Sequence, residues 1–279
     1  HSVDTRELAL EMLIEINERG AFRHIVLRSV LDKYQYLSKQ DRAFMTRLVD
    51  GTIEYMLQLD YIIDSFSKTK VRKMKPFIRN LLRMSVYQIK YMDAVPDSAV
   101  CNEAVKLAKR HKFAQLSGFV NGVLRNIARN IDSVQFDTLS IRYSMPQWIV
   151  DRFVAAYGEK KAEEIFKAFH NKSTISIRTN LTRCTPDELR AMLEAEGVTV
   201  TAVDELDYAF VISGFDYLNG LQSFRDGLFY VQDISSMLVA QTAAPKKGDY
   251  VIDVCAAPGG KSTHIAELCR VAVMCSRVT

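Results

Sequence analysis

Residues 250–263 read YVIDVCAAPGGKST, and this stretch decides how the C-terminal part of the chain is interpreted. Its first five residues predict a short apolar strand, its two glycines a tight turn, and the THIAEL that starts at Thr263 a helix. Glycines let a backbone approach a ligand closely, and a helix start offers free N–H groups and a positive dipole. Asp253 is polar between apolar neighbours at the end of the strand. The pattern therefore predicts a binding site for an adenosyl or phosphate ligand.

Other nucleotide-binding patterns fit this loop less well. A P-loop has the form G-x-x-x-x-G-K-[ST]; Gly260, Lys261 and Ser262 supply its second half, but Cys255 stands where the first glycine is required. The dinucleotide-binding pattern G-x-G-x-x-G is absent. An ordinary strand-to-helix turn with two glycines is the structural alternative, and the length of the CAAPGGK match argues against it.

The loop resembles a known cofactor site. Residues 253–263, DVCAAPGGKST, resemble the S-adenosylmethionine loop of the RNA cytosine-5 methyltransferases of the Sun/RsmB family. Residues 229–240, FYVQDISSMLVA, resemble the segment that precedes this loop in the same family. The resemblance implies S-adenosylmethionine as the cofactor and small-subunit ribosomal RNA as the partner. The cofactor-binding residues that it implies are Cys255, Ala256, Ala257, Pro258, Gly259, Gly260 and Lys261.

Composition indicates a globular protein of two or three domains. The chain has 279 residues, of which 48% are hydrophobic and 25% charged. No apolar run approaches the roughly 18 residues of a membrane span, and the N-terminus does not read as a signal peptide. The net charge of +4 is uneven, since residues 1–133 carry +7 and residues 134–279 carry −3. The basic first part suggests a polyanionic partner, with a solvated surface as the alternative.

The cysteines and histidines show no metal-binding spacing. The five cysteines form no C-x-x-C pair, which argues against a zinc site or a disulfide framework and for a reducing cytoplasm; they are Cys101, Cys184, Cys255, Cys269 and Cys275. Four isolated histidines are predicted to be surface or capping residues: His24, His111, His170 and His264.

Residues 1–133 predict an all-α domain of six or more short helices. Apolar residues recur at helical spacing from Ala9 to Ile127 with almost no strand signal. Asp4 and Glu7 predict a capping box, Gly20 a helix end, and Ser38 with Asp41 another helix start. The helical pattern around residues 39–66 is expected to be broken into two helices.

A basic segment lies between the middle helices of this domain. Seven Lys and Arg residues fall between Lys68 and Arg83, with no acidic residue among them. The residues predicted to contact a phosphate backbone are Lys68, Lys70, Arg72, Lys73, Lys75 and Arg79. The alternative is a solvated loop and helix face, and such a pattern carries no base-reading information.

The helical part also resembles a known RNA-binding domain. Residues 42–63, 81–109 and 119–129 resemble the NusB-like domain that opens the Sun/RsmB proteins. This resemblance favours RNA binding by the basic segment without identifying the contacting lysines.

Residues 134–216 predict a connector with a small α+β region. Residues 147–168 have a helical pattern, and a strand at 175–180, a helix at 186–197 and strands at 198–203 and 209–213 follow. YSMPQWIVDRF and ISIRTNLTR, which start at Tyr143 and Ile175, resemble the RNA-recognition-like connecting region of the same family. Residues 217–279 then predict the incomplete start of a Rossmann-like methyltransferase sheet, in which residues 271–275 supply one further short strand.

No catalytic residue is assigned. The resemblance implies that a cysteine thiolate attacks carbon 6 of the cytosine and that a second cysteine assists product release. These cysteines lie in Pro-Cys and Thr-Cys motifs downstream of the cofactor loop, and neither motif follows residue 268 here. The expectation is a C-terminally truncated chain without methyl transfer activity, with no metal, no membrane partner and a monomeric state. The rival function is a non-catalytic NusB-like RNA-binding protein, whose RNA affinity falls with salt and does not depend on the cofactor.

Overall fold

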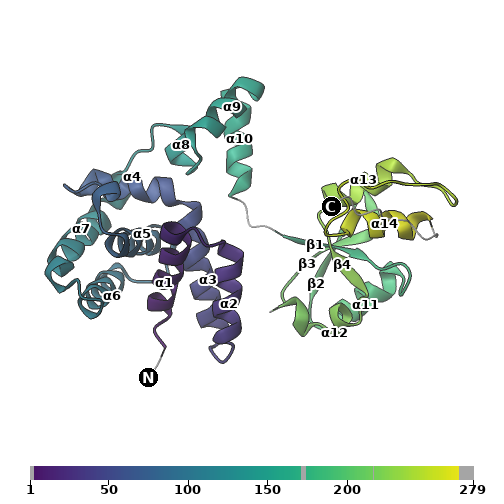
Figure 1. Ribbon diagram of the computed structural model, residues 1–279, viewed down its shortest axis with the longest axis horizontal. Coiled ribbons are helices and arrows are strands. Elements are labelled where there is room, and N and C mark those ends of the chain that lie inside the picture. Colours follow the sequence, from purple (N-terminus) through teal and green to yellow (C-terminus); the bar gives the residue numbers. More distant parts are fainter. Residues whose placement is uncertain (1–2, 171–173, 216, 270–279) are drawn as a thin grey trace. The chain divides into compact units, whose positions relative to one another are not determined.

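The computed structural model describes residues 3–170, 174–215 and 217–269. They belong to two compact units, His1–Asn171 and Lys172–Thr279 (Figure 1). The predicted strand at 271–275 lies outside the described residues. Within the described residues, no helix is both long and apolar enough to cross a membrane.

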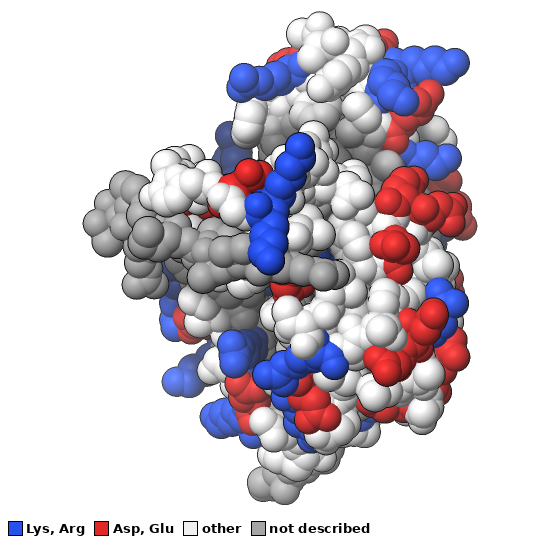
Figure 2. All heavy atoms as spheres, turned by 90° about the vertical axis from the view of Figure 1, so that its right-hand side faces the viewer, with Lys and Arg blue, Asp and Glu red and all other residues white. Residues whose placement is uncertain are grey.

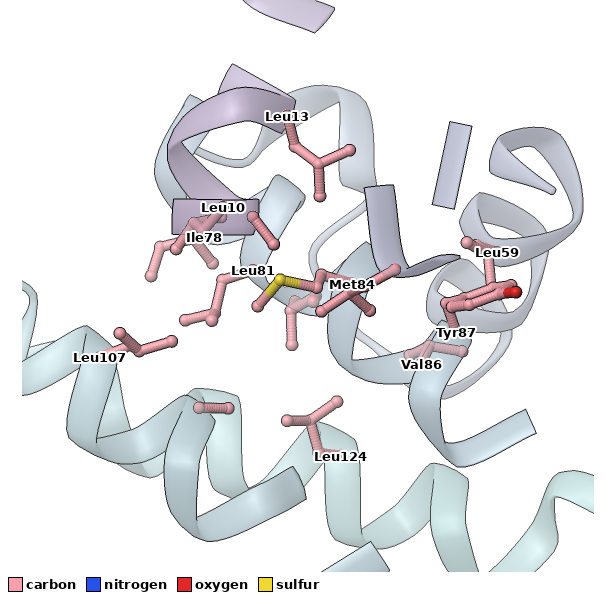
Figure 3. Close-up of a cluster of buried hydrophobic side chains, with 14 of the residues drawn as sticks. Leu10, Leu13, Leu59, Ile78, Leu81, Met84, Val86, Tyr87, Leu107 and Leu124 are labelled. Carbon is pink, nitrogen blue, oxygen red and sulfur yellow. The ribbon is translucent and has the colours of Figure 1, made fainter. Parts of the chain in front are cut away.

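The first unit begins with a bundle of seven α-helices, as the sequence predicts. The helices are α1 (Thr5–Arg19), α2 (Arg23–Lys33), α3 (Lys39–Glu54), α4 (Met56–Phe66), α5 (Pro76–Tyr91), α6 (Asp97–Arg110) and α7 (Ser117–Asn130), with short 3-10 turns η1 (Val71–Lys73), η2 (Ala114–Leu116) and η3 (Ile131–Ser133). Helix α5 packs against α1, α3, α4, α6 and α7. Figure 3 shows its Leu81 and Met84 among leucines of the surrounding helices, all buried. Burial of α5 on most of its surface makes it the centre of the apolar core.

The predicted helix ends are found, with one difference. Asp4 accepts hydrogen bonds from the backbone N–H groups of Arg6 and Glu7, and Ser38 accepts one from Asp41. Gly20 ends α1 with φ of 73°, a left-handed conformation that glycine adopts without strain. The predicted Asp4–Glu7 capping box is wrong in its second half, because the Glu7 carboxylate bonds to Arg110 and His111 instead.

Three further helices complete the first unit: α8 (Leu139–Arg142), α9 (Gln147–Tyr157) and α10 (Glu159–Phe169). The single helix predicted over 147–168 is therefore two helices, because Gly158 between them has φ of 77°. The side-chain amide of Gln58 in α4 donates to the backbone carbonyls of Ile141, at 3.2 Å, and Arg142, at 2.9 Å. These bonds attach α8 to the bundle. The boundary between the two units falls at 171/172, inside the predicted connector.

The second unit contains an antiparallel four-stranded sheet with the order β2-β3-β1-β4. Its strands are β1 (Ile175–Thr179), β2 (Thr199–Val203), β3 (Leu206–Ser213) and β4 (Phe229–Val231), and its helices are α11 (Pro186–Ala195), α12 (Gln222–Arg225), α13 (Ile234–Ala243) and α14 (Gly260–Cys269), with the 3-10 turn η4 (Leu218–Gly220). Helices α11 and α12 lie on one face of the sheet, and α13 and α14 on the other (Figure 1). The predicted β-α-β-β order of a small α+β region is confirmed.

The strand predicted at residues 250–254 is not formed. These residues have no regular secondary structure, and the side chains of Tyr250, Ile252 and Val254 are 75%, 63% and 72% exposed. A strand needs a neighbour to pair its N–H and C=O groups, and none of the four described strands pairs with this segment. The apolar pattern indicated a strand, but pairing decides whether a strand exists.

Candidate cofactor loop and RNA-binding segment

Asp253 closes the predicted cofactor loop. Its Oδ1 accepts the backbone N–H of Cys255 at 3.0 Å, and its Oδ2 accepts the hydroxyl of Ser262 at 2.7 Å. One carboxylate thus bonds to the first residue of the CAAPGGK segment and to the residue that follows the segment. Hydrogen bonds to a carboxylate are stronger than those between neutral groups, and these two hold the ends of the loop close together.

The loop leads directly into the start of α14. Gly259 has φ of 115°, which only glycine adopts readily, and its carbonyl accepts the N–H of Thr263 at 2.9 Å to begin the helix. A helix start leaves its first N–H groups without intrahelical acceptors. The side chains of Cys255, Ala257, Pro258 and Lys261 are exposed. The predicted cofactor residues are therefore brought together in one accessible loop in front of free backbone donors.

Behind the loop lies a buried arginine that the sequence analysis did not single out. Arg178 of β1 donates from Nε to Gln232 Oε1 at 2.8 Å and from Nη2 to Thr263 Oγ1 at 3.3 Å, and its Nη1 bonds to the Glu267 carboxylate. Its guanidinium also lies 4.6 Å from the centre of the Tyr230 ring. The side chains of Arg178 and Glu267 are 1% and 8% exposed. This ion pair therefore joins the sheet to α14 in a water-poor environment.

The surroundings oppose both charges of this pair. Burial raises the pKa of Glu267 and lowers that of Arg178, whereas the attraction between the two groups acts in the opposite sense on each. Removing water from an ion is costly, and only good geometry with further hydrogen bonds offsets that cost. Gln232, Thr263 and Tyr230 supply these additional contacts to Arg178.

The prediction that His264 is a surface or capping residue is wrong. Its side chain in α14 is buried, and neither ring nitrogen has a hydrogen-bond partner among the described residues. Its ring packs edge-to-face with the Tyr208 ring, at a centroid distance of 5.2 Å and an interplanar angle of 72°. Burial and then the charge of Arg178 lower the pKa of His264 to about 4, so the ring is neutral at pH 7.

The basic segment of the first unit forms the exposed connection between α4 and α5. Five of its six predicted RNA-binding residues have exposed side chains, and they are Lys68, Lys70, Arg72, Lys73 and Lys75. Residues 71–73 of the segment form the turn η1. The side chains of Val71 and Met74 are buried in the bundle core. The alternation of buried apolar and exposed basic residues fixes the charges on the surface side of this turn.

Two arginines further along have partners within the domain. Arg79 donates to both oxygens of Glu18, and this bonding lowers the pKa of Glu18. Arg83 binds both oxygens of Asp60, at 2.6 and 2.7 Å. The charge of Arg79, a predicted phosphate contact, is thus already balanced by a carboxylate. The five exposed residues before it remain the more suitable phosphate contacts.

Charged side chains of both signs lie on the face that Figure 2 draws. On the face drawn in Figure 2, Lys and Arg side chains are interspersed with Asp and Glu among the described residues, and acidic side chains gather along one flank. A run of exposed basic residues without an intervening acid, as in residues 68–75, therefore differs from that surface.

One weak signal in the sequence points to the arginine behind the loop. Arg178 is a charged residue in an otherwise apolar and small-residue strand, ISIRT. In an alternating strand such a residue is expected to face water. Its partner Glu267 lies 89 positions away, so only the folded chain shows that helix α14 covers it.

Comparison with known proteins gives a consistent domain order. The profile of the NusB family matches residues 3–129, that of the ferredoxin-like domain of RsmF/B-like methyltransferases matches residues 145–215, and that of the 16S rRNA methyltransferase RsmB/F matches residues 240–276. Fold and loop thus define the class, a NusB-type helical domain followed by the ferredoxin-like and cofactor-loop parts of an RNA methyltransferase. Residues 145–215 and 240–276 thus match models of the RsmB/F methyltransferases, and residues 3–129 match the NusB family.

Individual relatives agree with this assignment. The probable ribosomal RNA small subunit methyltransferase B of Bacillus subtilis is 38% identical over 270 residues, which are 94% of this chain and 60% of the relative. The protein of the same name from Synechocystis sp. is 33% identical over 95% of this chain and 61% of its own length. The crystal structure of PH0851 superposes with a TM-score of 0.73 at 21% identity, over 100% of this chain and 65% of that one, and shows the shared fold. The chain thus spans about 60% of the length of the curated relatives.

Proposed function

We propose that this chain supplies the RNA-binding and cofactor-loop parts of an enzyme that methylates carbon 5 of a cytosine in small-subunit ribosomal RNA, with S-adenosylmethionine as the methyl donor. The observation that carries the proposal is the CAAPGGK loop, which Asp253 closes at the start of α14. The names of the relatives support ribosomal RNA of the small subunit as the substrate. The free thiols described in the chain are consistent with work in a reducing cytoplasm.

The described residues have binding roles in this proposal. The loop from Cys255 to Lys261 binds the cofactor, with backbone N–H groups of α14 as donors to its acceptor atoms. No described cysteine is assigned as the nucleophile. Burial raises the pKa of both Cys101 and Cys184, which favours the unreactive thiol over the thiolate.

Binding of S-adenosylmethionine to this chain, measured by calorimetry, tests the proposal. Because Gly259 needs a positive φ of 115° while nothing lies within 4 Å of an added Cβ, Gly259→Ala perturbs the backbone of the loop alone. We expect this variant to bind the cofactor about tenfold or more weakly.

Gly248→Ala is the matched control for this variant. Gly248 also has a positive φ, 94°, and open space at its Cβ, but it precedes the loop. We expect it to keep the affinity of the wild type. Equal loss in both variants, or no binding by the wild type, would argue against the proposed cofactor site; binding of ATP instead would favour a P-loop.

We also propose that the exposed basic segment contacts the phosphate backbone of the RNA. Replacing Lys68, Arg72 and Lys73 by Gln removes three exposed charges. We expect the slope of log affinity against log salt, measured with a 16S rRNA transcript, to fall by about 2, since each single-strand phosphate contact contributes about 0.7.

An equal change of charge elsewhere in the first unit gives the control. Arg28, Lys33 and Lys109 of the bundle are also exposed and lie outside the basic segment, and their replacement by Gln is expected to leave the slope unchanged. An equal fall in both triple variants would mean that general charge, and not this segment, attracts the RNA. RNA binding by a chain that does not bind the cofactor would favour the rival function of a non-catalytic RNA-binding protein.

A further inference from the structure

One buried side chain links the sheet to the helix that begins at the cofactor loop. Arg178 reaches from β1 through the sheet face that α13 and α14 cover, and its three donor nitrogens bond to Gln232, Glu267 and Thr263. Thr263 is the last residue of the 250–263 stretch that contains the loop, and Glu267 lies one helical turn further along α14. The guanidinium thus holds two successive turns of the helix that begins at the cofactor loop.

Gln232 extends this link to the loop itself. Arg178 Nε can only donate, so it fixes the orientation of the Gln232 amide by bonding to its oxygen. The amide carbon of Gln232 then lies 3.9 Å from the position that a Cβ on Gly260 would take. The first residue of α14 therefore lies near a side chain whose orientation Arg178 sets.

The backbone of residue 232 is anchored to the same strand. Its N–H donates to the carbonyl of Ser176 at 3.2 Å, and its carbonyl accepts the Ser176 hydroxyl at 2.7 Å. Ser176 and Arg178 point to the same side of β1, two residues apart. Strand β1 thus controls both the backbone and the side chain that support the start of α14.

We propose that Arg178 is a positioning residue for the cofactor loop, and that the ferredoxin-like sheet therefore forms the back of the cofactor site. This inference rests on the proposed function of the loop. Arg178 lies in the region that matches the ferredoxin-like domain, 145–215. The inference gives it a role in the cofactor loop, which lies in the region that matches the methyltransferase model, 240–276. A planar guanidinium with three separately directed bonds fixes orientation as well as charge, which a single point charge cannot do.

The test separates positioning from charge balance. Arg178→Met leaves the Glu267 carboxylate buried without its partner, so we expect a lower melting temperature together with weaker binding of S-adenosylhomocysteine. The double variant Arg178→Met/Glu267→Leu removes both buried charges, and apolar replacement of a buried ion pair is often neutral. We expect it to recover the melting temperature of the wild type while its affinity stays about tenfold or more below that of the wild type, because Gln232 and Thr263 have lost their common donor.

Arg83→Met is the matched control, since Arg83 forms a two-bond pair with Asp60 in the first unit. It is expected to lower stability and leave the affinity unchanged. Full recovery of affinity in the double variant would overturn the inference, because Arg178 would then only balance a charge.

Amide hydrogen exchange of α14 keeps the inference separate from the proposed function. If the wild type binds no S-adenosylhomocysteine, the proposed cofactor fails, and exchange decides alone. Faster exchange of α14 in the double variant than in the wild type, at equal melting temperature, supports positioning by Arg178. Equal exchange overturns it.

Discussion

Gly51→Ala is expected to lower the stability of the helical bundle by about 3 kcal/mol or more, although a glycine inside a helix is ordinarily a liability. A Cβ at this position of α3 would lie 2.0 Å from Cζ and 2.1 Å from the hydroxyl oxygen of Tyr87. Tyr87 is buried, and its ring lies 6.2 Å from that of Tyr55 and 5.4 Å from that of Tyr91. The ring therefore has little freedom to move aside.

A double-mutant cycle checks this explanation by calorimetric unfolding. In a Tyr87→Leu background the obstructing end of the ring is gone, so Gly51→Ala should no longer destabilise and should gain about 0.5–1 kcal/mol from helix propensity. Gly122→Ala in α7 is the control, because nothing lies within 4 Å of its added Cβ, and a gain of similar size is expected. An undiminished loss in the Tyr87→Leu background would show that the ring is not the cause.

Acid is expected to destabilise the second unit through His264. Burial lowers the pKa of its ring from its ordinary value of 6.5 to about 4. As the pH falls below 6.5, the unfolded chain binds a proton that the folded chain excludes, so stability present at pH 7 is lost toward pH 4. The expected loss is about 2 kcal/mol between pH 7 and pH 5 and about 3 kcal/mol by pH 4.

The comparison with His264→Leu isolates this contribution. The variant has no ring to protonate, so native-state hydrogen exchange of α13 and α14 should show the acid-induced loss reduced by that amount. Differences between variant and wild type also cancel the titration of the nearby Glu267. His24→Leu, at an exposed position of the first unit, is expected to keep the pH profile of the wild type. The same acid loss in His264→Leu as in the wild type would contradict the assignment.

Helix and strand identity followed closely from local patterns in this chain. Asp4, Ser38 and Gly20 marked helix ends because caps depend on neighbours a few positions away. The alternation in ISIRT and the apolar spacing in the bundle predicted the sheet and the helical core for the same reason. The resemblance of the CAAPGGK loop led to the RsmB/F assignment, which the family profiles bear out. Its cofactor residues and the RNA contacts in residues 68–75 remain predictions.

Only the tertiary structure decided the features that depend on partners far away in the sequence, such as strand pairing and side-chain burial. The apolar residues 250–254 looked like a strand, yet no described strand pairs with them. His264 looked like an isolated surface histidine, and α14 buries it against Tyr208. The sequence by itself thus determined the order of the helical and sheet regions and several helix ends, while the role of the loop remains a prediction. The fold decided which charges are balanced, which glycine lies against a buried ring and which residues surround Arg178, because those depend on atoms that are distant in sequence and adjacent in space.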